Sequence, residues 1–217
     1  MKFFIDTANL EEIEEMSAYG IVDGVTTNPS IIAREGKDLK ETLIRICNMV
    51  DGPISGEVLA LDAETMIKEG LEIAGWHRNM VVKIPMTPEG IKAVRALSAK
   101  GIRTNVTLVF SPAQAILPAK NHSLFVSPFI GWKEANGEDC KTYIQNIVDI
   151  YKNYGFYGKT QIICAAIRTP KQIVDCAVAG ADIITTGLAV YQDTMKHAYT
   201  NQGIGTFIDA WNHTITE

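Results

Sequence analysis

The chain alternates between short apolar runs and longer stretches whose apolar residues follow helical spacing. The runs are rich in Val, Ile and Phe, residue types that favour strands. Because parallel strands need a long crossover between them, usually a helix, this alternation predicts consecutive strand–helix–strand units. Eight strands are expected, over residues 3–6, 21–26, 54–59, 80–84, 103–109, 124–129, 161–167 and 182–186.

The stretches between the runs carry helix start signals. Thr87 followed by Pro88 supplies a capping side chain and a residue suited to the first helical position. The same Ser/Thr–Pro pair begins at Ser111 and at Thr169. A final helix is predicted from about residue 205 to residue 217, after the eighth strand.

No linker, low-complexity tract or charge run divides the chain, so residues 1–217 are expected to form a single domain. Eight strand–helix units in one α/β domain close into a (β/α)8 TIM barrel more often than they form an open doubly wound sheet. The closed barrel with an extra C-terminal helix is therefore the favoured fold, and the open sheet is the alternative.

Composition and charge narrow the class of partner. Apolar residues make up 47% of the chain and charged residues 21%, as in ordinary globular domains. The net charge of -5 provides no basic surface, which argues against nucleic acid or an anionic membrane as the main partner. A small-molecule substrate fits this balance better.

The spacing of the cysteines bears on metal binding, and the N-terminal residues bear on the cellular location of the protein. The four cysteines are far apart, with no C-x-x-C pair and no histidine placed to complete a metal site, so reduced thiols and no metal are expected. The N-terminus reaches Asp6 after three apolar residues, which predicts neither a signal peptide nor a spanning helix. A cytoplasmic protein is expected.

Polar residues stand at the ends of most of the predicted strands. In a (β/α)8 barrel the C-terminal ends of the strands surround the active site, so these side chains are expected to converge at one mouth. The candidates are Asp6, Thr26, Thr27, Asn28, Glu57, Lys83, Asn105, Thr107 and Ser127. For Asp6 or Asn28 taken alone, a helix cap or Asx turn is the alternative, and Thr and Ser hydroxyls commonly bond to local backbone.

Glu57 and Lys83 are harder to explain as local structure. Each interrupts a strand that should be buried on both faces, where an unpaired charge is costly. A Glu57–Lys83 ion pair with a purely structural role is one interpretation. The other is catalytic, because apolar surroundings favour the neutral amine of Lys83, the form that attacks a carbonyl carbon.

Five segments carry a family resemblance: FIDTAN at 4–9, GVTTNPS at 24–30, VVKIPMT at 81–87, TNVTL at 104–108 and VSPF at 126–129. Together they closely resemble the short transaldolase and fructose-6-phosphate aldolase family, in order and nearly end to end. The resemblance implies a class I aldolase that passes a dihydroxyacetone unit through a lysine-bound enamine, without metal or organic cofactor. It also implies a ketose donor and an aldehyde acceptor such as glyceraldehyde 3-phosphate or erythrose 4-phosphate.

The resemblance assigns roles to individual residues. Lys83 matches the Schiff-base lysine, and Asp6 matches the acid/base that removes the proton from the carbon-4 hydroxyl. Glu57 and Thr107 match the pair that holds a water for proton transfer. The predicted substrate-binding positions in the matched segments are Thr26, Thr27, Asn28, Asn105, Ser127 and Phe129.

Two of these positions distinguish the branches of the family. Members that release free dihydroxyacetone carry Gln and Tyr where this chain has Glu57 and Phe129. The chain therefore resembles a transaldolase, with the free aldolase as the alternative. A sugar-binding barrel without catalysis is the non-enzymatic alternative.

The chain departs from the family where a terminal phosphate is usually bound. Trp132 stands in place of an Arg and Ala166 in place of a Ser, while Arg168 is retained. Trp offers one N–H where Arg offers a fork of donors suited to a dianion, so a singly charged terminus fits better. The predicted donor is 6-deoxy-6-sulfofructose, a sugar of sulfoglycolysis, which would leave sulfolactaldehyde. The alternative is a phosphorylated ketose held by Arg168, Lys133 or helix N-termini.

The C-terminal helix resembles the family segment that packs on a neighbouring protomer in ring-shaped pentamers, often stacked as decamers. The resemblance therefore implies a homo-oligomer.

Overall fold

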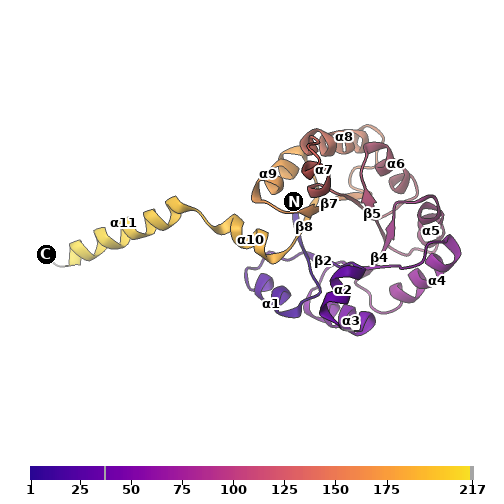
Figure 1. Cartoon of the computed structure of the whole chain (residues 1–217), viewed down its shortest axis with the longest axis horizontal. Helices are drawn as coiled ribbons and strands as arrows, with labels where there is room; N and C mark the ends of the chain where they lie inside the picture. Colours follow the sequence, from indigo (N-terminus) through magenta and orange to yellow (C-terminus); the bar gives the residue numbers. More distant parts are fainter. Residues whose placement is uncertain (37, 216–217) are drawn as a thin grey trace.

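The computed structural model describes residues 1–36 and 38–215 and shows a closed barrel of eight parallel strands (Figure 1). Strand order follows the sequence, and pairing of the last strand with the first closes the sheet, so the open-sheet alternative is wrong. The strands are β1 Lys2–Asp6, β2 Gly24–Thr26, β3 Ile54–Glu57, β4 Met80–Pro85, β5 Thr104–Val109, β6 Phe125–Pro128, β7 Gln161–Ile167 and β8 Ile183–Thr186. Each of the eight predicted runs corresponds to one strand, although β1 begins one residue before its run and β4 ends one residue after its run.

Helices form a ring outside the strands (Figure 1). Two short helices, α2 and α7, lie in connections that also contain a longer crossover helix, and these two were not predicted from the sequence. The short helix α10 follows β8 and completes the eighth strand–helix unit. The helices are α1 Leu10–Ala18, α2 Pro29–Glu35, α3 Leu39–Met49, α4 Ala63–Ala74, α5 Pro88–Ser98, α6 Pro112–Lys120, α7 Gly131–Ala135, α8 Cys140–Asn153, α9 Pro170–Ala179, α10 Leu188–Met195 and α11 Ala198–Ile215.

The predicted helix starts are confirmed. The hydroxyl of Thr87 accepts a hydrogen bond from the Gly90 N–H at 2.9 Å, and Pro88 occupies the first turn of α5. Ser111 caps α6 in the same way. At α9, Thr169 takes part in a full capping box.

The bottom of the barrel interior is apolar. The five side chains that fill it, here called the apolar floor, are almost completely buried. They are Phe4, Val81, Phe125, Ile163 and Ile183. The rings of Phe4 and Phe125 pack edge to face with centroids 6.0 Å apart. Gly24 makes room for them, because a Cβ at this position would lie 2.7 Å from ring atoms of Phe4.

Two residues further along several of these strands, the inward-facing side chain is polar. Side chains two apart on a strand point to the same face. Asp6 therefore lies above Phe4, Lys83 above Val81, Ser127 above Phe125 and Thr185 above Ile183, and these four polar residues line one cavity. The interior changes from apolar to polar at one level, near the C-terminal ends of the strands.

All four cysteines are free and buried between the strands and the helices. Burial raises the pKa of Cys47 and of Cys140 to about 11. These two thiols are therefore protonated near neutral pH, which makes them poor nucleophiles and poor metal ligands.

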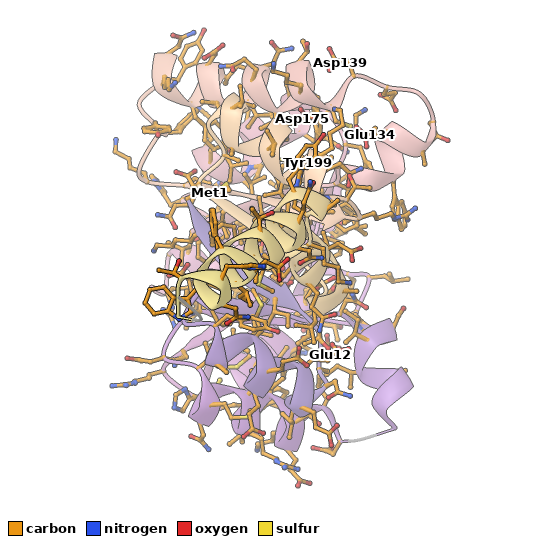
Figure 2. All side chains as sticks on the ribbon, turned by 90° about the vertical axis from the view of Figure 1, so that its left-hand side faces the viewer. Met1, Glu12, Glu134, Asp139, Asp175 and Tyr199 are labelled. Carbon is orange, nitrogen blue, oxygen red and sulfur yellow. The ribbon has the colours of Figure 1, made fainter. Side chains whose placement is uncertain are left out.

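The last helix projects away from the barrel (Figure 1), and Figure 2 views the molecule from the side on which it projects. Within the described residues α11 starts at Ala198, before the predicted residue 205, because the His197 backbone and ring accept hydrogen bonds from the first turn. The predicted end at 216–217 lies outside the described residues. Four apolar side chains at helical spacing are exposed on α11: Ile204, Phe207, Ile208 and Trp211.

Candidate active site

A cavity of about 180 Å³ opens at the C-terminal ends of the strands. It is small beside the roughly 300–1,000 Å³ of sites for drug-sized ligands, which suits a small polar metabolite. Its walls come from β1, β2, β4 to β8 and the segments that follow β2 and β6. The lining residues are Asp6, Thr26, Asn28, Lys83, Thr107, Ser127, Phe129, Trp132, Ala165, Ala166 and Thr185.

Lys83 lies on β4, is only 6% exposed and still reaches the cavity. Its Nζ lies 3.1 Å from Oε2 of Glu57 and donates to the carbonyl oxygen of Thr27 at 2.9 Å. The β3–β4 register places Glu57 directly beside Lys83. The ion pair considered in the sequence analysis is therefore present. A purely structural pair would not need its amine to face a cavity.

Asp6 ends β1 and points into the cavity. Its Oδ1 accepts a hydrogen bond from Thr26 Oγ1 at 2.7 Å. Helix α1 is capped by Asn9, whose side chain accepts from two backbone N–H groups, so the interpretation of Asp6 as a cap is wrong. Asn28 does cap α2, through a bond from the Ile31 N–H, and it lines the cavity as well.

Thr107 brings an unsatisfied hydroxyl to the cavity. Its Oγ1 is buried and has no hydrogen-bond partner among the described residues. The next residue, Leu108, has φ 57°, and the β5–β6 register shifts between Val106 and Val109. A buried hydroxyl without a partner is unfavourable, so this atom is available to bind water or substrate.

Glu57 does not line this cavity; it lines a neighbouring one of about 160 Å³ beside α2. On one side of β4, Glu57 pairs with Lys83 in register; on the other side, β5 places Asn105 beside Lys83 and Thr107 beside Pro85, two residues further along. Glu57 thus contacts the amine directly, whereas Thr107 shares only the cavity with it.

Asn105 and Thr27 lie behind the cavity wall. Ser127 Oγ donates to Asn105 Oδ1 at 2.7 Å, and Asn105 Nδ2 donates to Ser55 Oγ at 3.1 Å. Thr27 Oγ1 donates to the Ser55 carbonyl oxygen at 2.8 Å. Among these four residues only Ser127 lines the cavity.

The outer end of the cavity is aromatic. The rings of Phe110, Phe129 and Trp132 pack together with centroids 5.5 to 5.8 Å apart, and the Trp132 side chain is half exposed. Ala166 has φ 56° within an irregular stretch of β7, and it lines the cavity on the strand beside Phe129, which pairs with Ala165. This end has few polar groups.

Arg168 is exposed and lies at the rim, outside the cavity lining. A Cβ added at Gly131 would lie 3.2 Å from Arg168 Nε, which places the arginine beside the residue that precedes Trp132. In residues 1–36 and 38–215, the Arg168 guanidinium has no hydrogen-bond or ion-pair partner. Lys133, by contrast, is paired with Glu138 and lies 4.9 Å from the Tyr143 ring centroid.

Four residues in or behind the cavity wall were not predicted from the sequence: Thr185, Ala165, Ser55 and Phe110. Thr185 carries a usable signal, because two threonines end the eighth strand, and the second strand also ends on a threonine, Thr26. Ser55 and Phe110 reach the site only through neighbours on other strands or loops. Among the described residues no group of His, Cys, Asp and Glu is placed to hold a metal ion.

Residues 3–217 match the family described as Transaldolase/Fructose-6-phosphate aldolase. The chain belongs to this family. It is 52% identical over 217 residues to a probable transaldolase of Clostridium acetobutylicum, covering 100% of both chains. It is also 52% identical over 211 residues to a probable transaldolase of Caldicellulosiruptor saccharolyticus, covering 97% of each. Family membership indicates an enzyme with a ketose donor and an aldehyde acceptor.

A solved structure supports the fold alone. A putative fructose-1,6-biphosphate aldolase from Coccidioides immitis superimposes with a TM-score of 0.60 at 14% identity. The match covers 88% of this chain and 77% of that one. In the described part of this chain, none of the helices is both long and apolar enough to cross a membrane. The cytoplasmic location stays a prediction.

Proposed function

We propose that this family member is a class I transaldolase in which Lys83 forms a Schiff base with the carbonyl carbon of a ketose. One observation carries the proposal: the buried Lys83 amine faces the cavity while Glu57 lies 3.1 Å from its Nζ. Asp6 faces the same cavity from β1. A nucleophile, a group that can take its proton and a second carboxylate are the parts that this chemistry requires.

Schiff-base formation needs a proton to leave Lys83 and water to leave the adduct. Glu57 accepts a proton from the amine, and the neutral nitrogen attacks the ketose carbonyl to give a carbinolamine. Protonation of the carbinolamine hydroxyl then releases water and leaves the iminium. The free Thr107 hydroxyl is suited to hold the water that carries this proton.

Carbon–carbon cleavage needs a base at the carbon-4 hydroxyl. Asp6 Oδ1 is occupied by Thr26, whereas Oδ2 has no partner among the described residues. Asp6 takes the hydroxyl proton as the bond between carbons 3 and 4 breaks, and the electron pair moves into the iminium to form an enamine. The aldehyde leaves, and an acceptor aldehyde then reverses these steps. Phe129 offers no hydroxyl to protonate the enamine, which favours transfer over release of dihydroxyacetone.

The outer end of the cavity supports a singly charged donor terminus. Trp132 and Ala166 line it, and Arg168 lies at the rim without a side-chain partner among the described residues, while Lys133 is occupied by Glu138. We therefore propose 6-deoxy-6-sulfofructose as donor, giving sulfolactaldehyde, with glyceraldehyde 3-phosphate or erythrose 4-phosphate as acceptor. Phosphorylated ketoses are the alternative donors. Steady-state rates with sulfofructose and fructose 6-phosphate decide between them, and a large preference for the phosphate rules out the sulfonate.

A homo-oligomer, pentameric or decameric, is part of the proposal. The exposed apolar side chains of α11 are suited to pack on another protomer, because a projecting helix buries little of its own surface. Sedimentation of the intact chain tests this, and a monomer at micromolar concentration contradicts it.

Borohydride reduction in the presence of a ketose tests the central step. Reduction converts a Schiff base to a stable amine, so mass spectrometry should find one adduct, located on Lys83. Lys83→Ala should give no adduct. Lys133→Ala should give the wild-type adduct, because Lys133 forms an ion pair with Glu138 and does not line the cavity. Ketose binding without any adduct on the wild-type chain would instead support the non-catalytic sugar-binding barrel.

A further inference from the structure

Thr185 is a buried residue of the cavity wall that the proposed reaction does not yet use. It lies on β8, is 2% exposed and lines the cavity. Its Oγ1 lies 2.6 Å from Thr26 Oγ1, and Thr26 in turn donates to Asp6 Oδ1 at 2.7 Å. Strand β1 pairs with β2 on one side and β8 on the other, so the two threonines come from the two neighbours of the strand that carries Asp6.

The directions of these hydrogen bonds follow from counting protons. A threonine hydroxyl has one proton to donate, and an ionised carboxylate can only accept. With Asp6 ionised, the Thr26 proton is committed to Asp6 Oδ1. The 2.6 Å contact between the hydroxyls must then use the proton of Thr185. Both hydroxyl protons therefore point toward Asp6, in a chain whose two hydrogen bonds polarise each other.

We propose that Thr185 is a positioning residue for the carbon–carbon cleavage step, acting on Asp6 through Thr26. By donating to Thr26 it keeps the Thr26 proton on Oδ1, and this holds the carboxylate with Oδ2 free for the carbon-4 hydroxyl. No proton changes heavy atoms within the chain; the only proton transferred is the one that Asp6 takes from the substrate. The inference rests on the proposed role of Asp6 as the base.

The same residue has no comparable influence on Lys83. The Lys83 amine is held by Glu57 and by the Thr27 carbonyl oxygen, neither of which bonds to Thr185. Loss of the Thr185 hydroxyl should therefore slow cleavage and leave Schiff-base formation unchanged. A residue that serves only general stability would change both steps together.

The adjacent Thr186 provides a matched control. It is on the same strand and is also 2% exposed, but its hydroxyl donates to the Ile167 carbonyl oxygen and it does not line the cavity. Thr186→Val removes a buried hydroxyl of the same kind with no connection to Asp6. Comparing it with Thr185→Val separates the effect of losing any buried hydrogen bond from the effect of losing the hydrogen bonds that link Thr185 through Thr26 to Asp6.

The experiment measures two steps for each variant: the rate of borohydride trapping on Lys83, and the single-turnover release of aldehyde from the donor. We expect Thr185→Val to slow aldehyde release about tenfold, a fraction of the roughly 10²–10⁴-fold that general base catalysis contributes. Its trapping rate should match wild type. Thr185→Ser, which keeps the hydroxyl, should restore release, and Thr186→Val should show the wild-type ratio of the two rates.

Three results would overturn the inference: equal slowing of trapping and release in Thr185→Val, wild-type release in that variant, or no rescue by Thr185→Ser. If Thr185→Val does not fold, the comparison of Thr185→Ser with Thr185→Ala decides. Asp6→Asn separates this inference from the proposed function. If Asp6→Asn abolishes aldehyde release while Thr185→Val does not affect it, the proposed role of Thr185 is wrong and that of Asp6 stands. If Asp6→Asn also releases aldehyde at the wild-type rate, the proposed role of Asp6 as the base is wrong.

Discussion

The inner and outer ends of the cavity are built differently. At the inner end, Lys83, Asp6 and Ser127 are on strands and each is held by a hydrogen bond or ion pair of defined geometry. At the outer end, Trp132 and Arg168 are on the segments after β6 and β7, with Trp132 half exposed and Arg168 unpaired among the described residues. Strands position the groups for the reaction, whereas the segments that follow the strands present groups that can change with the substrate.

Removing the nucleophile should give the largest effect. Lys83→Met keeps an unbranched side chain of similar reach without an amine, so the transfer rate should fall by at least about 10⁴-fold, the scale seen when a nucleophile is lost. Lys133→Met at the outer end should stay near wild type, because Lys133 pairs with Glu138. Similar losses in both variants would remove the distinction between the two ends.

The second inner-end prediction concerns the free hydroxyl of Thr107. Thr107→Val keeps the shape of the side chain and removes the group that is suited to hold water beside Lys83. Because the water transfers the proton needed for dehydration, trapping should slow by about 10²-fold, the lower end of general acid–base contributions. Stability should be maintained or improved, since no hydrogen bond of Thr107 Oγ1 among the described residues is lost. Rapid trapping kinetics and thermal unfolding check the two parts.

At the outer end, Trp132→Arg should change which substrate is used. A guanidinium here adds a second cation near Arg168, and two cations suit a phosphate dianion better than a sulfonate. The ratio of kcat/KM for fructose 6-phosphate to that for sulfofructose should rise by about 10- to 100-fold, or ~1.4–2.7 kcal/mol. The rate of borohydride trapping with dihydroxyacetone itself, which has no terminal group, should not change. A fall in both measurements would mean that Trp132 supports the reaction chemistry.

The inner end was more accessible to sequence reasoning than the outer end. Period-two alternation predicts which strand positions share a face, so Asp6 and Lys83 could be placed at one mouth from their positions alone. Thr185 could have been found by the same rule applied to the eighth strand. Neither the bulge at Ala166 nor the position of Arg168 follows from alternation, because an irregular backbone breaks the register on which the rule depends.

Contacts between strands that are far apart in the sequence could not be predicted from the sequence either. The Thr26–Thr185 hydrogen bond joins residues 159 apart, and the position of Glu57 in a neighbouring cavity depends on how α2 packs. The start of α11 at Ala198 was missed because glycines at 203 and 205 weaken the helical pattern there. Local patterns predict elements and faces, whereas such details depend on closure of the whole barrel.

The smallest effect is expected from the remaining cation at the rim. Arg168→Gln keeps polarity and length while removing the charge, so KM for an anionic donor should rise about tenfold, ~1.4 kcal/mol, with kcat little changed. Unphosphorylated fructose should show no change in KM, because it carries no charge for the guanidinium to bind.

Ionic strength provides the control for this last substitution. The exposed Arg168 is screened by salt, so raising the salt concentration should increase KM for the anionic donor in wild type and have less effect in Arg168→Gln. If KM for fructose rises as much as KM for the anionic donor, Arg168 acts on the shape of the outer end through Gly131, which it adjoins, and the charge is not what selects the substrate.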